Sequence, residues 1–398
     1  MSYNQNVFDK TSSKEDFYLK KDGLKDGCSK NEWIKDNYLN IENIYIEECK
    51  TGWDDIINKF TGHPLQLDNW GSLKSQSLWT GKKLLVKISD DKILAAASVL
   101  TRKLPFGFGK ISHIPRGPAF AEDILKNIIV CNLVFDKILQ WIKKNIKPIA
   151  LICEPAYLSK DFKFLTRSDS LADLEADNKI INQIKNSFVQ KMFLSTSPIL
   201  FNKTLIINLK QSEDQMLANL SRKNRSHLRS AERKGIKIKI AQTKDDIKDV
   251  LKIYKEVANR ASFSLHKDEY FYKAFELDIG PLYIAYLNTD SNRQQPLAFL
   301  WLATSKFQAF ELWGGANSQG QISYANNLIK WFAICDMKKN RKIIYDMNGL
   351  LNQGISNFKK SFEKREDILT PSYTISFSLR YKLYIFVYRI YKFLKKYV

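Results

Sequence analysis

The stretch GISNFKKSFE, residues 354–363, places two adjacent lysines between two phenylalanines. If the stretch is helical, Phe358 and Phe362 lie on one face, because they are four residues apart. At about 100° per residue, Lys359 lies at the margin of that face and Lys360 points nearly away from it. A lysine at such a margin can cover the edge of a core with its aliphatic stem, or it can aim its ammonium into a site. The segment alone leaves both interpretations open.

A second group of cations lies in SRKNRSHLRSAERKGIKIKI, residues 221–240. Its arginines would form one stripe along a helix that ends at Gly235, and they are Arg222, Arg225, Arg229 and Arg233. Like charges at this spacing oppose helix formation unless an anion binds them. The guanidinium fork fits phosphate or carboxylate, and arginine is used here although lysine dominates elsewhere. A solvated basic face and a phosphate-binding surface are the two interpretations.

Three shorter motifs carry side chains that could contact a ligand. NWGSLKSQSLW places Trp70 four residues before Lys74, which is typical of either a core tryptophan with a surface lysine or a binding site. HIPRGPAF holds Arg116 in a restricted turn, where it caps a loop or contacts an anion. YDMNG ends a strand, with Tyr345 and Asp346 at the strand's end.

The formal net charge is +21 over 398 residues. A charge of this size indicates a polyanionic partner such as nucleic acid, an anionic membrane or a phosphate-bearing substrate. The five cysteines are scattered, without CxxC or Cys/His spacing, and the four histidines show no triad-like spacing. We therefore predict free thiols in a reducing compartment and no metal site.

The first residues, MSYNQNVFDKTSSKED, are polar and contain no apolar segment of the signal-peptide kind. No window approaches the run of about 18 apolar residues that a membrane-spanning helix needs. These features predict a cytoplasmic protein, and peripheral contact with the inner face of the cell membrane is left open.

Two domains are expected from the length, because single cores rarely exceed about 300 residues. Residues 1–40 are polar and predict a flexible N-terminal tail. Beyond the tail, strand-like runs such as KLLVKI alternate with helical runs such as residues 123–145. The order of elements is similar in the two halves, which indicates a duplicated domain.

In their order along the chain, these motifs resemble the pattern of the FemABX family of peptidoglycan aminoacyltransferases. The residues that carry the resemblance in the first half are Trp70, Gly71, Lys74, Arg116, Gly117 and Pro118. In the second half they are Thr204, Leu209, Arg225, Arg229, Ala231, Gly235, Gly315, Ala316, Tyr345, Asp346, Gly349, Phe358, Lys359 and Phe362. The family's glycine after the last phenylalanine is Glu363 here, so the end of that helix is open.

The resemblance implies an α+β fold of two GNAT-like (acyl-CoA N-acyltransferase fold) domains, each a mixed sheet flanked by helices. The first would comprise residues 41–197, joined by the C-terminal residues 366–398, and the second residues 198–365. No long coiled-coil arm is expected. The phosphate loop of coenzyme A-dependent relatives is missing from the sequence, so no cofactor is expected beyond aminoacyl-tRNA as co-substrate.

The resemblance also implies a reaction: transfer of glycine, alanine or serine from aminoacyl-tRNA to the stem-peptide amine of lipid II or UDP-MurNAc-pentapeptide. Lys359 would act as the catalytic cation beside Phe358, at the tRNA 3′ end. Lys74 and Arg225 would together bind the precursor's diphosphate. The other substrate-binding candidates are Trp70, Arg116, Arg229, Tyr345 and Asp346. The protein would act as a monomer.

Two alternatives to this reaction are a GNAT-fold acyltransferase with another acceptor, such as a phospholipid or small amine, and a non-catalytic nucleic-acid-binding protein. The C-terminal stretch FSLRYKLYIFVYRIYKFLKKYV also has two interpretations. It is either an interfacial helix for an anionic leaflet or a helix packed on the first domain.

Overall fold

The computed structural model describes residues 43–90, 92–171, 178–288 and 294–395. The predicted N-terminal tail, residues 1–40, lies outside these ranges. All described residues belong to one compact unit, so the domain boundaries predicted inside it stay predictions. Within the described ranges, no helix combines the length and apolar character needed to cross a bilayer.

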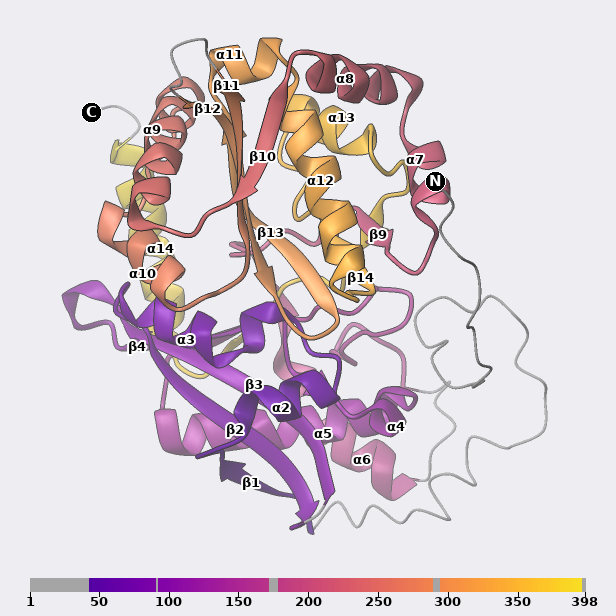
Figure 1. Cartoon of the computed structure of the whole chain (residues 1–398). Coiled ribbons are helices and arrows are strands. Elements are labelled where there is room, and N and C mark those ends of the chain that lie inside the picture. The colour runs from indigo at the N-terminus through magenta and orange to yellow at the C-terminus, as the bar shows by residue number, and fades with distance from the viewer. Residues whose placement is uncertain (1–42, 91, 172–177, 289–293, 396–398) are drawn as a thin grey trace, which may run out of the picture. The chain divides into compact units, whose positions relative to one another are not determined.

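The first of two large sheets has eight strands (Figure 1). Its path is β1 (Tyr45–Glu48), β2 (Thr80–Ser89), β3 (Lys92–Lys103), β4 (Lys110–Pro115), β6 (Ala150–Glu154), β16 (Tyr373–Ser376) and β7 (Phe193–Leu194), while β5 (Ala119–Phe120) pairs with β3. Among the described strands of this sheet, only β4 and β6 pair in parallel. Because β16 comes from the C-terminal part, the chain returns to this sheet after building the second one.

The helices around the first sheet are α2 (Trp53–Lys59), α3 (Asp68–Ser75), α4 (Glu122–Leu125), α5 (Ile128–Trp141) and α6 (Asn178–Asn186). The sequence predicts one helix over residues 123–145, but the structure divides it. Asn127 has an extended backbone and its side chain accepts hydrogen bonds from the N–H groups of Ile129 and Val130, which begins a new helix. A π-helical turn, Ile142–Ile146, follows α5.

The second sheet has six strands, in the order β10 (Ile236–Ile240), β11 (Leu282–Asn288), β12 (Gln294–Thr304), β13 (Gln308–Ala316), β14 (Ile344–Asp346) and β9 (Ile206–Asn208). Within the described part of the chain, its one parallel pair joins β13 to β14. A separate two-stranded ladder joins β8 (Lys203–Thr204) to β15 (Asp367–Ile368), from which the chain returns to β16.

Helices cover both faces of the second sheet, as Figure 1 shows. Alternate residues of β11 point to opposite faces: Leu282 and Ile284 pack with α9 (Lys244–Ala261) and α10 (Asp268–Glu276). Tyr283 and Ala285 pack on the other side. That side is covered by α7 (Glu213–Asn219), α8 (Arg222–Arg233) and α12 (Ala325–Lys339), with α11 (Ser318–Ile322) and α13 (Gln353–Lys360) nearby. We call these two sides the α9 face and the α12 face.

Several contacts tie the two halves together. Leu73 of α3 is fully buried in the apolar cluster of the α9 face. The Asn69 side chain donates to the carbonyl of Asp278 at 3.2 Å. The Gln308 side chain donates to the carbonyl of Thr61 at 2.7 Å. The first half therefore packs against the second sheet directly, and α3 is one of the elements that does so.

Asn224 connects three helices of the α12 face. It is almost completely buried, donates to the Ser361 carbonyl at 3.2 Å and accepts from the Asn327 side chain at 2.8 Å. Ser361 ends α13, so Asn224 fixes α8 next to the helix that carries Lys359.

We expect Asn224→Ala to lower the free energy of unfolding by about 1–3 kcal/mol, because it removes two hydrogen bonds and leaves the buried side-chain amide of Asn327 without its acceptor. Urea denaturation measures this loss. The matched control is Asn219→Ala in α7, whose exposed side chain bonds to Gln211. It should cost no more than about 0.5 kcal/mol. Equal losses in the two variants would contradict the role of Asn224.

Candidate active site

Helix α13 forms as the apolar spacing predicts. It begins at Asn352, whose side chain accepts a hydrogen bond from the N–H of Ile355. Phe358 and Phe362 pack into the cluster of the α12 face, with their ring centroids 5.5 Å apart. Lys359 is therefore carried at the edge of a core, as its place in the helix predicts.

The Lys359 ammonium points into the turn that follows β14. It donates to the carbonyls of Met347, Asn348 and Gly349, at 2.6, 3.1 and 2.8 Å. Asn348 has a left-handed backbone, with φ of 60°, and its N–H donates to Asp346 at 2.7 Å. The turn thus presents three carbonyls to one point, and the lysine satisfies all of them.

Lys360 has a different environment. It is exposed and forms an ion pair with Glu366 at 2.5 Å, and both side chains are accessible to solvent. The two adjacent lysines are therefore divided as the helical periodicity predicts, one toward a buried turn and one toward water.

A buried ion pair lies close to Lys359. The Lys330 ammonium contacts the two carboxylate oxygens of Glu311 at 2.5 and 2.6 Å, and the Tyr345 hydroxyl donates to the same carboxylate at 2.9 Å. Lys330 also lies 5.6 Å from the centroid of the Phe358 ring. Tyr345 thus supports the site from the core, and burial raises its pKa well above the ordinary value.

The pKa of Lys359 is lowered to about 8, chiefly by burial of its ammonium, and the nearby Lys330 ammonium acts in the same direction. Glu311 and Asp346 act in the opposite direction. Asp346 is itself buried and accepts from the Thr204 hydroxyl; burial raises its pKa, while the Arg116 guanidinium lowers it. Lys359 therefore lies among buried charges of both signs, and its proton is held less tightly than that of an ordinary lysine.

Arg116 is only 3% exposed, and its backbone adopts a left-handed conformation. Its guanidinium donates to the Phe201 carbonyl at 2.6 Å and lies 5.9 Å from the Phe310 ring centroid. Burial lowers the pKa of Arg116, and the carboxylates of Asp346 and Glu154 raise it. Of the two roles that the sequence leaves open, this position favours holding the chain together over contact with an anion.

Lys74 occupies an aromatic pocket on the α9 side. Its ammonium lies 5.3 Å from the Trp70 ring centroid and 5.9 Å from that of Tyr270. Burial lowers the pKa of Lys74, and Arg102 lowers it further. Among the described residues, neither Lys74 nor Arg102 has a carboxylate at ion-pair distance. Two neighbouring cations without an acidic partner form a local site for an anion.

The arginine stripe of α8 lies on the α12 face. Arg222, Arg229 and Arg233 are exposed, while Arg225 donates to the carbonyls of Ala218 and Leu220 at the α7–α8 link. The N–H of Ser221 donates to the Ser361 carbonyl at 2.9 Å, so α8 begins beside the end of α13. The stripe and Lys359 are thus anchored to the same point.

The joint assignment of Lys74 and Arg225 to one diphosphate requires a correction. Lys74 and Trp70 lie with the α9 face, whereas α8 packs on the α12 face through Leu228 and Ala231. A six-stranded sheet separates the two side chains. The structure brings Lys359, Phe358, Tyr345 and Asp346 together, places Arg225 and Arg229 on the same face, and places Lys74 and Trp70 on the other.

Strands β13 and β14 pair only briefly beside the turn that holds Lys359. These strands pair over only three residues of each, Gln308–Phe310 and Ile344–Asp346. Within the described ranges no strand pairs with the following residues of β13 on that side. The turn that holds Lys359 lies at this point, since the Asn348 side chain donates to the Glu311 carbonyl at 2.9 Å.

Residues 56–296, more than half of the chain, match the FemAB family. The chain belongs to the FemAB family. It is a peptidoglycan-related transferase, and the resemblance drawn from the order of its motifs is confirmed. No curated protein matches the chain.

The crystal structure of FemX is similar over 86% of this chain and 99% of that chain, with 15% sequence identity and a TM-score of 0.68. A conserved protein of unknown function from Bacteroides thetaiotaomicron is similar over 83% of this chain and 98% of that one, with 13% identity and a TM-score of 0.50. These likenesses show the fold. The predicted α+β architecture, with mixed sheets flanked by helices, is thereby confirmed. The longest helix in the described ranges is α9, with 18 residues, so no long arm extends from them.

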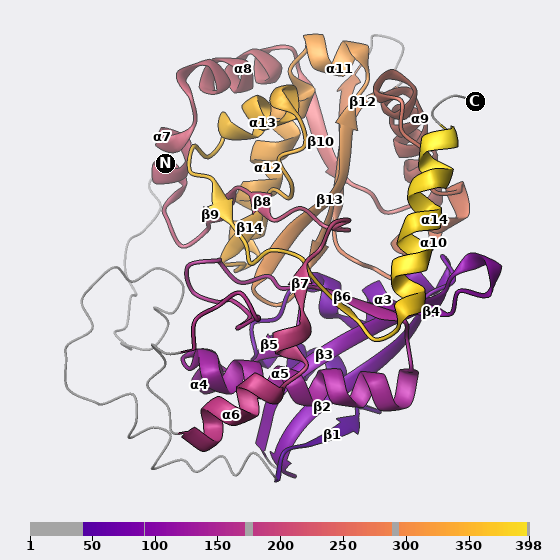
Figure 2. The same cartoon turned by 180° about the vertical axis from the view of Figure 1, so that it is seen from behind.

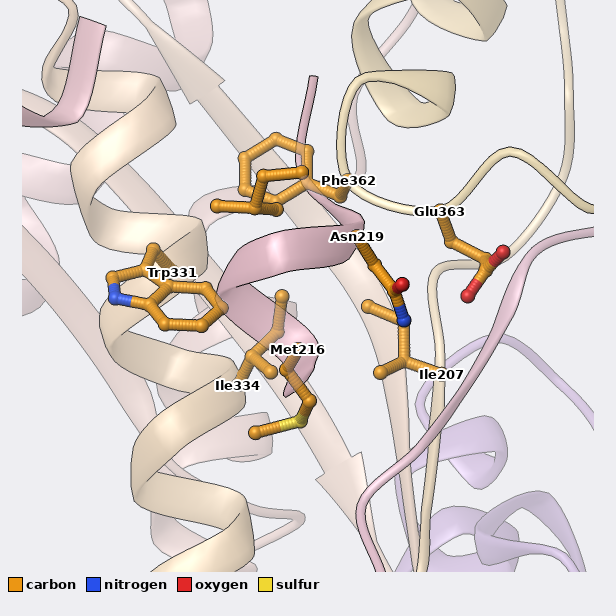
Figure 3. Close-up of a pocket in the computed structure, with 8 residues that line it drawn as sticks. Ile207, Met216, Asn219, Trp331, Ile334, Phe362 and Glu363 are labelled. Atoms are coloured by element: carbon orange, nitrogen blue, oxygen red, sulfur yellow. The ribbon is translucent and has the colours of Figure 1, made fainter. Parts of the chain in front are cut away.

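A small pocket of this FemAB-family chain lies apart from Lys359, between α7, α12 and the end of α13 (Figure 3). Met216, Trp331 and Ile334 form its apolar wall, with Phe362 above them. It has room for about one water molecule, so we assign it no substrate.

Sequence reasoning missed Glu311, Lys330, Arg102 and Tyr270. Glu311 and Lys330 interrupt apolar runs, in FELWG and LIKWF, and such interruptions were the available signal. Arg102 and Tyr270 carried no local signal, because only the packing of β3 and α10 around α3 brings them to Lys74.

The low pKa of Lys359 can be measured directly. We expect its ε-carbon resonance in protein labelled with ¹³C-lysine to titrate near pH 8, whereas exposed lysines titrate above about 10. Lys359→Met identifies the resonance. Because the native state releases this proton before the unfolded state does, wild-type stability relative to Lys359→Met should rise between pH 8 and about pH 10. A midpoint above pH 10 would contradict the burial of the charge.

Proposed function

We propose that this chain transfers glycine, alanine or serine from aminoacyl-tRNA to the stem-peptide amine of lipid II or UDP-MurNAc-pentapeptide. The observation that carries the proposal is the half-buried Lys359, whose ammonium lies in the turn after β14, with a separate cationic site on each face of the sheet. Two polyanionic substrates need two such sites, and their reacting ends must meet at one point.

The donor would bind on the α12 face. Exposed arginines of α8 suit the phosphates of the tRNA acceptor end, since their guanidinium groups bind phosphate in a fork. Phe358, beside Lys359, supplies an aromatic surface on which a terminal base can stack. Because α8 is fixed to Ser361, phosphates on its stripe would place the tRNA end near α13.

The acceptor would bind on the α9 side. Lys74 and Arg102 form the cation pair for a diphosphate, and Trp70 and Tyr270 line the same pocket. A bound diphosphate would raise the pKa of Lys74 from its lowered value. The stem peptide would then extend toward the edge of β13, where its amine meets the donor.

In the reaction, the precursor amine attacks the ester carbonyl and forms a C–N bond. The C–O bond to the ribose breaks, and the proton lost by the amine goes to the ribose oxygen. The ester is already activated, so no covalent enzyme intermediate is needed. The charged ammonium of Lys359 donates to the carbonyls of residues 347–349. During the reaction, one of these N–H groups would donate to the developing oxyanion instead. The turn keeps the ammonium in place before substrate arrives.

The direct test is incubation of the full chain with glycyl-, alanyl- or seryl-tRNA and either acceptor, followed by mass spectrometry of the product. An acceptor heavier by one aminoacyl residue supports the proposal. Transfer to a phospholipid or a small amine instead, or no transfer with any charged tRNA, would contradict it.

Lys359→Met should lower kcat by about 10²–10³-fold, because it removes one donor to the oxyanion. Lys360→Met should stay within about twofold of wild type, because its ion pair is exposed. Rates are measured at a temperature where thermal melting shows both variants folded, since Lys359 also stabilises the turn. Wild-type turnover in both variants would contradict the assignment of Lys359.

The two faces should be separable by kinetics. Lys74→Met should raise KM for the precursor about tenfold or more and leave KM for aminoacyl-tRNA unchanged, because it removes one charged contact to phosphate. Arg229→Gln should weaken only the tRNA side and reduce the salt dependence of tRNA binding. Each variant is the control for the other. Parallel changes in the two KM values would refute the assignment of one substrate to each face.

A further inference from the structure

The C-terminal helix α14 (Leu379–Lys395) runs along the side of the molecule (Figure 2). It is apolar on two opposite faces. One face packs on the protein: Tyr381 is buried, and Tyr384 and Ile385 lie against Trp79 and Ile149 of the first half. The opposite face is exposed to solvent. Its large apolar side chains are Leu379, Leu383, Phe386, Val387, Ile390 and Leu394.

Two further exposed apolar residues lie at the end of the sheet where α14 begins. Phe106, at the tip of the β3–β4 hairpin, is 91% exposed, and Leu78, just before β2, is 86% exposed. The strand register places these segments in one row, through the pairs Thr80↔Thr101, Arg102↔Ile111, Ile111↔Ala150 and Ala150↔Ser376. The hairpin also contacts α14 directly, with the Phe108 and Tyr384 rings 5.6 Å apart.

The tip of the hairpin holds Phe106 outward by its backbone. Phe106 and Gly107 both have positive φ, 54° and 67°. A bulky residue rarely adopts this conformation, and the aromatic ring gains no burial within the protein from it. An exposed aromatic at a strained tip indicates that the ring has a partner outside the chain.

The charge at this end is mainly positive. The segments that form it, residues 76–82, 101–115, 141–153 and 371–395, contain no aspartate or glutamate, and Glu48 of β1 pairs with Lys82 at 2.6 Å. Their exposed cations include Lys103, Lys110, Lys147, Arg380, Lys382 and Arg389. A nucleic acid would use these cations but not the aliphatic face. A membrane interface with anionic headgroups uses both.

We propose that the exposed face of α14 and the tip of the β3–β4 hairpin together dock on the surface of an anionic phospholipid bilayer. With 17 residues, α14 is about 25 Å long, enough to lie along the interface. Its apolar face enters the boundary between headgroups and acyl chains, and its cations contact lipid phosphates. This docking does not depend on which acceptor the enzyme uses.

Docking has a consequence that rests on the proposed function. Arg102 lies at the end of the first sheet that would dock, with its guanidinium 4.9 Å from the Trp79 ring centroid. Its charge lowers the pKa of Lys74 and also that of Tyr384 in α14, so it lies near both side chains. A diphosphate at headgroup level would therefore lie next to the Lys74 pocket. This arrangement favours a lipid-linked acceptor over a nucleotide-linked one.

Flotation of the full chain on a sucrose gradient tests the docking. The vesicles contain equal parts phosphatidylcholine and phosphatidylglycerol, or phosphatidylcholine alone. Wild type should float with the anionic vesicles, and both high salt and neutral vesicles should reduce its recovery. Leu383→Asp with Phe386→Asp should lower recovery about tenfold, because it places two charges in the acyl boundary. Phe106→Asp should lower recovery by a smaller factor.

The matched control is Ile322→Asp in α11, a residue that is 74% exposed and lies outside the proposed surface. Its recovery should equal that of wild type. All substituted residues are exposed, so thermal melting should show the variants folded. Equal flotation of the double variant and the control would overturn the proposal. So would a wild-type dimer that the double variant abolishes without any flotation, because a second copy would then cover the face.

A comparison of the two acceptors tests the docking separately from the proposed reaction. The double variant should lose transfer to lipid-linked acceptor in vesicles and keep transfer to UDP-MurNAc-pentapeptide. Flotation of wild type without transfer to either acceptor would refute the reaction and leave the docking intact.

Discussion

The short parallel pairing of β13 with β14 is the constraint on which the rest of the site depends. Once the strands part after Asp346, the backbone turns through Asn348 and three carbonyls lose any strand partner. Buried carbonyls need donors, and a buried ammonium needs acceptors. Lys359 and the turn satisfy each other, so neither would keep its conformation alone. The end of the β13–β14 pairing thus creates the place for a cation.

The buried ion pair of Glu311 and Lys330 stabilises the core next to Lys359 and its turn. Tyr345 shares the same carboxylate, so strand β14 is joined to β13 and α12 by one network. Desolvation weakens the hold on the Lys359 proton, while the nearby carboxylates strengthen it. The outcome is a lysine that is charged near neutral pH and still close to its titration range. The ammonium of such a lysine can donate hydrogen bonds to an oxygen on which negative charge develops.

In the proposed function, separation of the two polyanionic substrates by a sheet would have a physical advantage. Two highly charged substrates would repel each other on one surface, whereas opposite faces keep their phosphates apart and bring only the reacting ends together. The Lys74 pocket borders the cationic, apolar end of the first sheet, and the arginine stripe lies on the other side of the second sheet. The Lys74 pocket with its cationic surroundings and the arginine stripe of α8 thus contribute to the large positive charge of the chain.

The sequence by itself determined the local features. Helical periodicity separated Lys359 from Lys360, the arginine spacing predicted a stripe that ends at Gly235, and the order of motifs predicted the family and its α+β fold. Tertiary structure decided which residues act together. The packing of α3 with the α9 face and of α8 with the α12 face places Lys74 and Arg225 on opposite faces. The packing of β3 and α10 around α3 brings Arg102 and Tyr270 to Lys74. The burial of Arg116 also depends on the contact between the two halves. Periodicity is a property of neighbouring residues and can be read from them, whereas the face on which a helix packs depends on strand order across the whole sheet.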